Sequence, residues 1–140
     1  MTTIANPADG IHTAGQPSKA QLEQLAADGV TAVINLRAEP ELDTVDFDES
    51  EVVEGAGMTY VWLPVSGPGD LSEALVKKVD EVLGGHEKVL IHCASSNRVG
   101  GVLALREGWI KGKGVEDAVA FGKAAGLSSL EPHIEKMLSS

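Results

Sequence analysis

Residues 88–101 read Lys88-Val-Leu-Ile-His-Cys-Ala-Ser-Ser-Asn-Arg-Val-Gly-Gly101, and they join a strand pattern, a polar loop and a helix pattern. The mainly apolar residues 88–91 predict a buried strand, and the apolar run 99–105 predicts a helix. The polar loop between them holds the only cysteine, Cys93. The first backbone N–H groups of a helix have no internal partner, and the helix dipole places partial positive charge there. Such a junction is therefore a seat for an anion.

Two side chains of this stretch predict nucleophilic chemistry. A thiol at a helix N-terminus loses its proton easily, so we expect Cys93 to be a nucleophile rather than a small buried hydrophobe. Arg98 lies five positions later, and its planar fork can hold two oxygens of a tetrahedral anion, unless it only pairs with a surface carboxylate. The loop N–H groups are expected to supply further donors, with the serine hydroxyls either assisting them or only forming the turn. These loop residues are Ala94, Ser95, Ser96, Asn97 and Val99.

The segment His92-Cys93-Ala-Ser-Ser-Asn-Arg98 resembles the signature loop of the cysteine-dependent phosphatases, the protein tyrosine and dual-specificity superfamily. That family has His-Cys, five residues and Arg, usually followed by Ser or Thr. Here four residues separate Cys93 from Arg98, and Val99 occupies the hydroxyl position. A cysteine loop with four intervening residues also resembles that of the single-domain rhodaneses, which bind a sulfane sulfur. The loop alone leaves both readings open.

A second stretch, from Ala14 to Glu41, favours the phosphatase reading. Its Gly-Gln-Pro-Ser, helix pattern, Val-Ile-Asn-Leu-Arg and acidic tail resemble the N-terminal portion of small bacterial dual-specificity-like phosphatases. The resemblance implies a phosphomonoester hydrolase without a cofactor, with Cys93 forming a cysteinyl-phosphate and Arg98 clamping the phosphate. It also implies that His92 orders the loop, and that the substrate is a phosphorylated protein or a small phosphomonoester.

The same family protonates the leaving group from an Asp on a neighbouring loop. Asp70 is our candidate general acid, because the loop 64–70 follows a predicted strand and is rich in Gly and Pro. The alternative role of Asp70 is N-cap of the next helix. Glu39, Asp43 and Asp46 are weaker candidates from the preceding acidic loop.

The remaining pattern predicts a single α/β domain over residues 1–140. Predicted strands at 31–36, 58–63 and 88–91 alternate with helices, which favours right-handed crossovers and a central, mostly parallel sheet flanked by helices on both faces. Ser-x-x-Gln at 18–21, Asp-x-x-Glu at 70–73 and Ser-x-x-Glu at 128–131 match capping boxes. Ligands of open α/β sheets lie beyond the carboxyl ends of the strands, so Arg37, the loop 64–70 and Cys93 should share one edge.

Composition narrows the range of possible partners and locations. The formal net charge of −10 disfavours binding to nucleic acid or to anionic membranes. The absence of a basic segment followed by an apolar one, and a single cysteine, lead us to expect a cytoplasmic protein. The histidines show no metal-ligand spacing, so no metal is expected, and nothing in the sequence specifies an oligomeric state. Besides the hydrolase, a rhodanese-like sulfurtransferase or persulfide carrier and a non-catalytic phosphate-binding module stay open.

Overall fold

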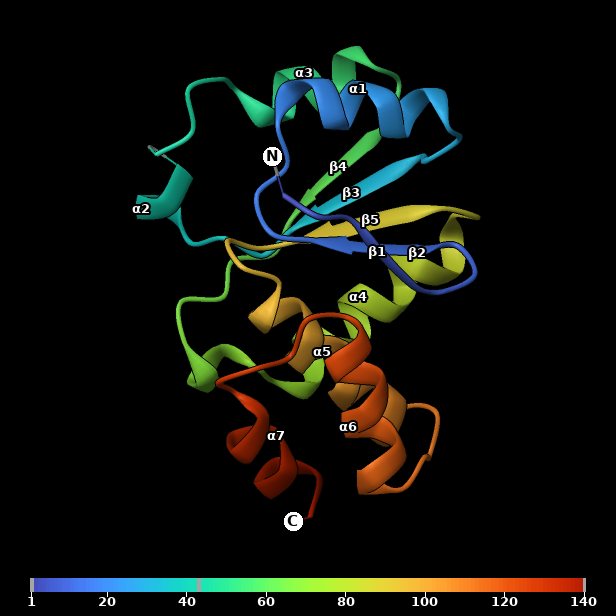
Figure 1. Ribbon diagram of the computed structural model, residues 1–140, viewed down its shortest axis with the longest axis vertical. Helices are drawn as coiled ribbons and strands as arrows, with labels where there is room; N and C mark the ends of the chain where they lie inside the picture. The colour runs from blue at the N-terminus through green and yellow to red at the C-terminus, as the bar shows by residue number, and fades with distance from the viewer. Residues whose placement is uncertain (1, 43, 140) are drawn as a thin grey trace.

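The computed structural model describes residues 2–42 and 44–139, which fold around one sheet (Figure 1). The strands of this part are β1 (Ala5–Ala8), β2 (Ile11–Ala14), β3 (Ala32–Asn35), β4 (Thr59–Trp62) and β5 (Val89–His92). The α-helices are α1 (Lys19–Ala27), α2 (Glu39–Leu42), α3 (Glu49–Gly55), α4 (Glu73–Gly85), α5 (Asn97–Trp109), α6 (Val115–Ala124) and α7 (Glu131–Leu138). A 3-10 turn, Pro68–Asp70, precedes α4.

The sheet has the strand order β1-β2-β5-β3-β4. The three pairings among β2, β5, β3 and β4 are parallel, and β1 is an antiparallel edge strand. The register places Ala14 of β2 and Asn35 of β3 on either side of His92 in β5. The prediction of a mostly parallel sheet is confirmed, and it puts the cysteine loop at the centre of the sheet's carboxyl edge.

Helices cover both faces of the sheet, as predicted (Figure 1). Alternate strand residues point to opposite faces, because the side-chain period of a strand is two. Val33 and Leu90 pack in the core beneath α1 and α3, whereas Ile34 and Ile91 pack in the larger core beneath α4 to α7. The strands are therefore apolar on both sides, which is why they read as continuous hydrophobic runs.

Several element boundaries differ from the predictions. Helix α5 begins two residues earlier than the apolar pattern indicates, so Arg98 lies in its first turn. The capping box predicted at residues 70–73 is wrong: Ser72 is the N-cap of α4 and accepts a hydrogen bond from the N–H of Leu75. The Ser128 capping box is also wrong, because α7 begins at Glu131 after Leu130. Ser18 does form the predicted box with α1.

Strands β1 and β2 and the four-residue helix α2 were not among the predicted elements. All three are short, and β1 contains a proline, so none shows a clear period. No helix in the described ranges combines the length and the apolar character needed to cross a bilayer.

Candidate active site

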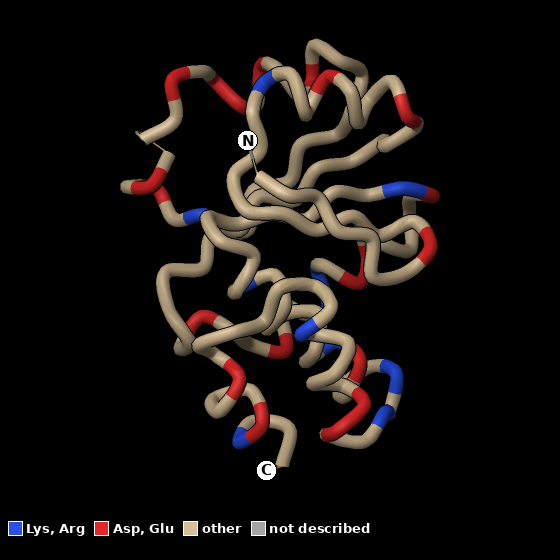
Figure 2. The backbone as a smooth tube through the Cα atoms, in the orientation of Figure 1, with Lys and Arg blue, Asp and Glu red and all other residues tan. Residues whose placement is uncertain are grey.

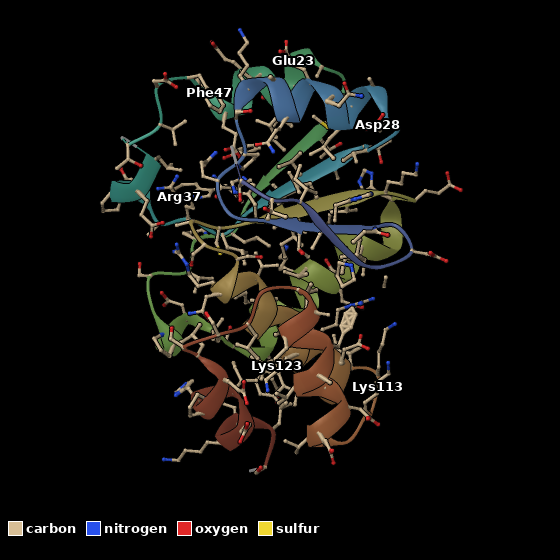
Figure 3. The ribbon with its side chains drawn as sticks, viewed as in Figure 1. Glu23, Asp28, Arg37, Phe47, Lys113 and Lys123 are labelled. Atoms are coloured by element: carbon tan, nitrogen blue, oxygen red, sulfur yellow. The ribbon has the colours of Figure 1, made fainter. Side chains whose placement is uncertain are left out.

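The candidate site is assembled at the carboxyl edge of the sheet. The N–H of Cys93 donates to the carbonyl of Ala14 (3.3 Å), and the N–H of Leu36 donates to the carbonyl of His92 (2.9 Å). Because these strands are parallel, the segments that follow them leave the sheet side by side. Figure 3 shows Arg37 at this edge, between α2 and the sheet. The predicted convergence of Arg37 and Cys93 on one edge is confirmed.

Cys93 has no exposed surface and belongs to the larger hydrophobic core. Its neighbour across the loop is Arg98, whose side chain is 16% exposed. The pKa of Arg98 is raised, first by its hydrogen bonds to Glu41 and further by the charge of Cys93 and a hydrogen bond to it. Arg98 and Cys93 are therefore close enough to interact electrostatically, and the Arg98 side chain is largely shielded from solvent.

The hydrogen bonds of Arg98 leave one edge of its guanidinium available. Nη1 donates to Oε1 of Glu41 (2.8 Å) and to the carbonyl of Val65 (2.8 Å), and Nη2 donates to Oε2 of Glu41 (2.8 Å). An arginine has five N–H donors in one plane, so the Nε donor and one Nη2 donor are left. Within the described ranges they meet no oxygen or nitrogen acceptor. These two donors form a second hydrogen-bonding edge, called here the second fork, that can donate to an anion near Cys93.

Glu41 of α2 is the residue that holds this arginine. Its hydrogen bonds from Arg98, and then from Arg37, lower its pKa from the usual 4.5 to about 2. The carboxylate is consequently ionised at neutral pH and serves as a fixed acceptor. Glu41 was not identified from the sequence, although its position four residues after Arg37 is the spacing of an ion pair across one helical turn.

Arg37 holds the start of the acidic segment in place. It is almost fully buried, and it donates from Nε to Glu41 (3.1 Å) and from Nη2 to Oγ1 of Thr44 (2.9 Å). Of the weaker acid candidates, Glu39 and Asp46 are exposed, and Asp43 lies outside the described residues. Figure 2 shows that acidic residues recur along the segment from α2 to α3.

The backbone of the cysteine loop offers a row of donors. The N–H groups from Ala94 through Val99 have no hydrogen-bond acceptor within residues 2–42 and 44–139. Ser96 has a left-handed backbone (φ 70°), and no other described non-glycine residue has positive φ. Successive N–H groups around a left-handed residue form a concave anion-binding nest. A residue in a sparsely populated conformation beside a candidate nucleophile also marks a functional position.

The loop side chains have separate partners. The hydroxyl of Ser96 donates to the carbonyl of Ala125 (2.6 Å), and Oδ1 of Asn97 accepts from the N–H of Ser128 (2.8 Å). Ala94 and Ser95 are exposed, and Val99 is buried in the core. Ser96 and Asn97 thus fasten the loop to the segment before α7, which leaves backbone groups as its main donors.

His92 is fully buried before the cysteine. Its Nε2 lies 2.6 Å from Oε2 of Glu49, and its Nδ1 lies 3.4 Å from the carbonyl of Cys93. Glu49 opens α3, is 8% exposed, and was not identified from the sequence. Its only sequence signal is its position after the N-cap Asp48, which places it at the first position of a helix but says nothing of His92.

Asp70 lies in the loop that follows β4, and it is exposed. Its carboxylate accepts a hydrogen bond from the N–H of Ser66 (2.8 Å). Because Ser72 is the cap of α4, the alternative role of Asp70 as that N-cap is excluded. The described contacts of Asp70 do not include Cys93 or Arg98.

Comparisons with known proteins give one curated relative and many similar structures. No family model matches the chain. The chain is 33% identical over 119 residues to a "Beta-lactamase hydrolase-like protein" from Agrobacterium fabrum, and it spans only about a quarter (27%) of that protein. That name describes a protein that extends well beyond the matched part.

The structural matches cover nearly the whole chain. A "putative phosphatase" from Neisseria meningitidis is 24% identical with a TM-score of 0.77, covering 95% of this chain and 96% of that one. A "putative phosphatase" from Shewanella putrefaciens is 25% identical with a TM-score of 0.71, covering 97% and 86%. TpbA from P. aeruginosa, in complex with pTyr, is 13% identical with a TM-score of 0.59, covering 99% and 96%. The chain has the fold of the cysteine-phosphatase superfamily.

Proposed function

We propose that this protein is a cysteine-dependent phosphomonoester hydrolase. The observation that carries the proposal is the Nε/Nη2 edge of Arg98 near Cys93, which meets no oxygen or nitrogen acceptor within the described residues. The backbone N–H groups of residues 94–99 likewise have no acceptor there. Three equatorial phosphoryl oxygens carry the charge in phosphoryl transfer, and fixed donors aimed at them are the main source of catalysis.

The first chemical step is attack by the Cys93 sulfur on phosphorus. The S–P bond forms while the P–O bond to the leaving group breaks, and the electron pair stays on the leaving oxygen. Arg98 and the N–H groups of residues 94–99 hold the three non-bridging oxygens throughout. Helix α5 begins directly after this loop, and the dipole at its N-terminal end favours the negative charge of the bound phosphoryl group.

Asp70 is our candidate for the proton donor to the leaving oxygen. Its exposed position and its freedom from helix capping support the role. In the second step, water attacks phosphorus, the S–P bond breaks, and the Asp70 carboxylate takes the proton from that water. The thiolate and inorganic phosphate are the products, so the cycle closes without a redox partner or a cofactor.

The proposed substrates are phosphorylated proteins and small phosphomonoesters. The phosphotyrosine complex of the similar TpbA supports a phosphorylated side chain as one substrate class. A phosphate held by backbone N–H groups and one arginine is recognised through its own oxygens, which makes the site tolerant of the group attached to it.

The decisive assay is hydrolysis of para-nitrophenyl phosphate by the wild type and by Cys93→Ser. We expect turnover by the wild type and none by the variant. Turnover that survives in Cys93→Ser removes the nucleophile assignment. A parallel assay with thiosulfate and cyanide tests the rhodanese-like alternative, and thiocyanate formation without phosphate release would replace our proposal with that one.

A further inference from the structure

The Gly-Gln-Pro-Ser segment at 15–18 has no part in the mechanism above, yet it touches the cysteine loop. It continues β2, which lies parallel to β5, so the residue after Gly15 passes alongside Ala94. The N–H of Gln16 donates to the carbonyl of Ala94 (3.3 Å). The segment therefore holds the backbone of the cysteine loop immediately after the sulfur-bearing residue.

Gly15 is required by this close approach. A Cβ at that position would lie 2.5 Å from the carbonyl oxygen of Ala94, which is closer than real Cβ contacts allow. The N–H of Gly15 also donates to Oγ1 of Thr2 (3.2 Å), which fastens the segment on its other side. A larger residue would push the segment away from the cysteine loop.

The side chain of Gln16 joins two networks that end at opposite sides of Cys93. Its Nε2 donates to Oε1 of Glu49 (2.8 Å), and the other oxygen of Glu49 lies 2.6 Å from His92. Its Oε1 accepts from Nη1 of Arg37 (2.6 Å), and Arg37 also binds Glu41, the carboxylate that holds Arg98. Gln16 is thus the link between the histidine before the cysteine and the arginine after it.

The orientation of the Gln16 amide is determined by the two side chains that it bonds. Arg37 only donates hydrogen bonds, so the amide oxygen of Gln16 must face it. A carboxylate only accepts, so the amide NH₂ must face Glu49. An amide satisfies both partners at once, whereas a carboxylate or an apolar side chain at position 16 leaves at least one of them unpaired.

We propose that Gly15 and Gln16 form a positioning element for the cysteine loop, in which the Gln16 amide holds His92 and Arg98 in register with Cys93. The inference deepens the proposed function and relies on it only for the turnover measurement. The segment contributes through the residues it holds and does not touch the substrate.

Four variants test the link. Gln16→Met removes the bonds to Glu49 and Arg37, together with a bond to the carbonyl of Pro17, at nearly the same side-chain length. Gln16→Glu keeps the acceptor for Arg37 but places a second carboxylate against Glu49. Glu49→Gln leaves two amides facing each other. The double variant Gln16→Glu with Glu49→Gln restores donor and acceptor at the contacts among Arg37, position 16, position 49 and His92, and it keeps the wild-type charge. The control is Gln24→Met, because Gln24 is exposed and bonds only Asp28.

We expect each single variant at 16 and 49 to lower kcat by about tenfold to a hundredfold with a smaller change in KM, since misplaced groups chiefly affect the transition state. The double variant should recover most of that loss, and Gln24→Met should behave as the wild type. Thermal denaturation is measured alongside. Recovery by the double variant cannot arise from a general loss of folding. A double variant no more active than the weaker single variant, or a Gln16→Met with wild-type kcat, overturns the proposal.

A second readout does not need turnover. Cys93 is the only cysteine, so its alkylation by iodoacetate and by neutral iodoacetamide can be followed unambiguously. A correctly held Arg98 favours the anionic reagent. We expect the rate ratio of iodoacetate to iodoacetamide to fall in Gln16→Met and to recover in the double variant. If the ratio falls and recovers in this way but the wild type shows no phosphatase turnover, the positioning element stands and the proposed function is refuted. If the ratio is the same in Gln16→Met and in the double variant as in the wild type, the positioning element is refuted.

Discussion

Replacing Glu41 by Gln should remove a pH-dependent part of the protein's stability. Glu41 is held by Arg98 and Arg37, and its pKa falls from 4.5 to about 2. At about 1.36 kcal/mol per pKa unit, that shift corresponds to about 3.4 kcal/mol of differential interaction. The carboxylate is 30% exposed, so solvent screening reduces the contribution to about 1–2 kcal/mol.

The sign of the effect follows from the lowered pKa. A carboxyl group with a folded-state pKa below its unfolded value stabilises the fold fully above pH 4.5, and the stabilisation is lost as the pH falls toward 2. The stability difference between the wild type and Glu41→Gln should therefore be largest at pH 7, fall to less than half near pH 3, and continue toward zero.

Urea denaturation at pH 7, 4.5 and 3 measures this difference directly. Glu39→Gln is the matched control, because Glu39 lies on the same short helix, is exposed, and makes no ion pair within the described part of the chain. Its difference from the wild type should be small at each pH. If Glu41→Gln and Glu39→Gln behave alike, or if the Glu41→Gln difference grows as the pH falls, the assignment of Glu41 as the ionised partner of Arg98 is wrong.

Three further substitutions test the phosphate clamp, the general acid and the packing behind the cysteine loop. Arg98→Lys keeps the charge but loses the second fork, so kcat for para-nitrophenyl phosphate should drop about a hundredfold or more, and a drop below tenfold would contradict bidentate clamping. Asp70→Asn should slow hydrolysis of phenyl phosphate far more than that of para-nitrophenyl phosphate, whose leaving group needs less protonation; equal slowing of both would remove Asp70 as the general acid. Gly100→Ala forces a Cβ against the backbone N of Leu127 and should cost about 1–3 kcal/mol in thermal denaturation, whereas Gly84→Ala, in open space on α4, should not destabilise; similar melting temperatures would contradict the close packing behind the loop.

The sheet and the cysteine loop were predictable because their signals are local. The apolar runs of β3, β4 and β5, and the Ser18 capping box, each lie within a few residues of sequence. The pattern Cys-x-x-x-x-Arg between a strand and a helix likewise predicts that the thiol, the arginine and the helix start lie close together. This prediction needs no information about distant residues. These features identify the candidate nucleophile and its clamp.

The residues that hold the clamp were not predictable in this way. Glu41 meets Arg98 across 57 positions, Glu49 meets His92 across 43, and Gln16 meets Glu49 across 33. Each is one of many polar residues in the sequence, and only the register of the parallel strands brings them to one edge. In the acidic segment from α2 to α3, the sequence pointed to Glu39, Asp43 and Asp46 as candidate acids, whereas Glu41 and Glu49 are the carboxylates that contact Arg98 and His92.

Local competition explains the capping error before α4. Asp70 and Ser72 are both good N-cap residues two positions apart, and because Asp70 belongs to the 3-10 turn Pro68–Asp70, Ser72 is the N-cap. Within the cysteine loop, Ser96 adopts a left-handed backbone, a conformation that Asn tolerates better than Ser. The Ser96 hydroxyl and the Asn97 amide both form hydrogen bonds with the segment between α6 and α7, so tertiary contacts outweigh residue preference here.

The most direct test of the account is to trap the covalent intermediate. The wild type is mixed with para-nitrophenyl phosphate, quenched within milliseconds, digested and examined by mass spectrometry for a phosphorylated thiol in the peptide that carries Cys93. We expect the modification in the wild type, its accumulation when Asp70→Asn slows hydrolysis of the S–P bond, and its absence in Cys93→Ser. Phosphate release by the wild type with no phosphorylation of Cys93, or with phosphorylation at another residue, would contradict the account.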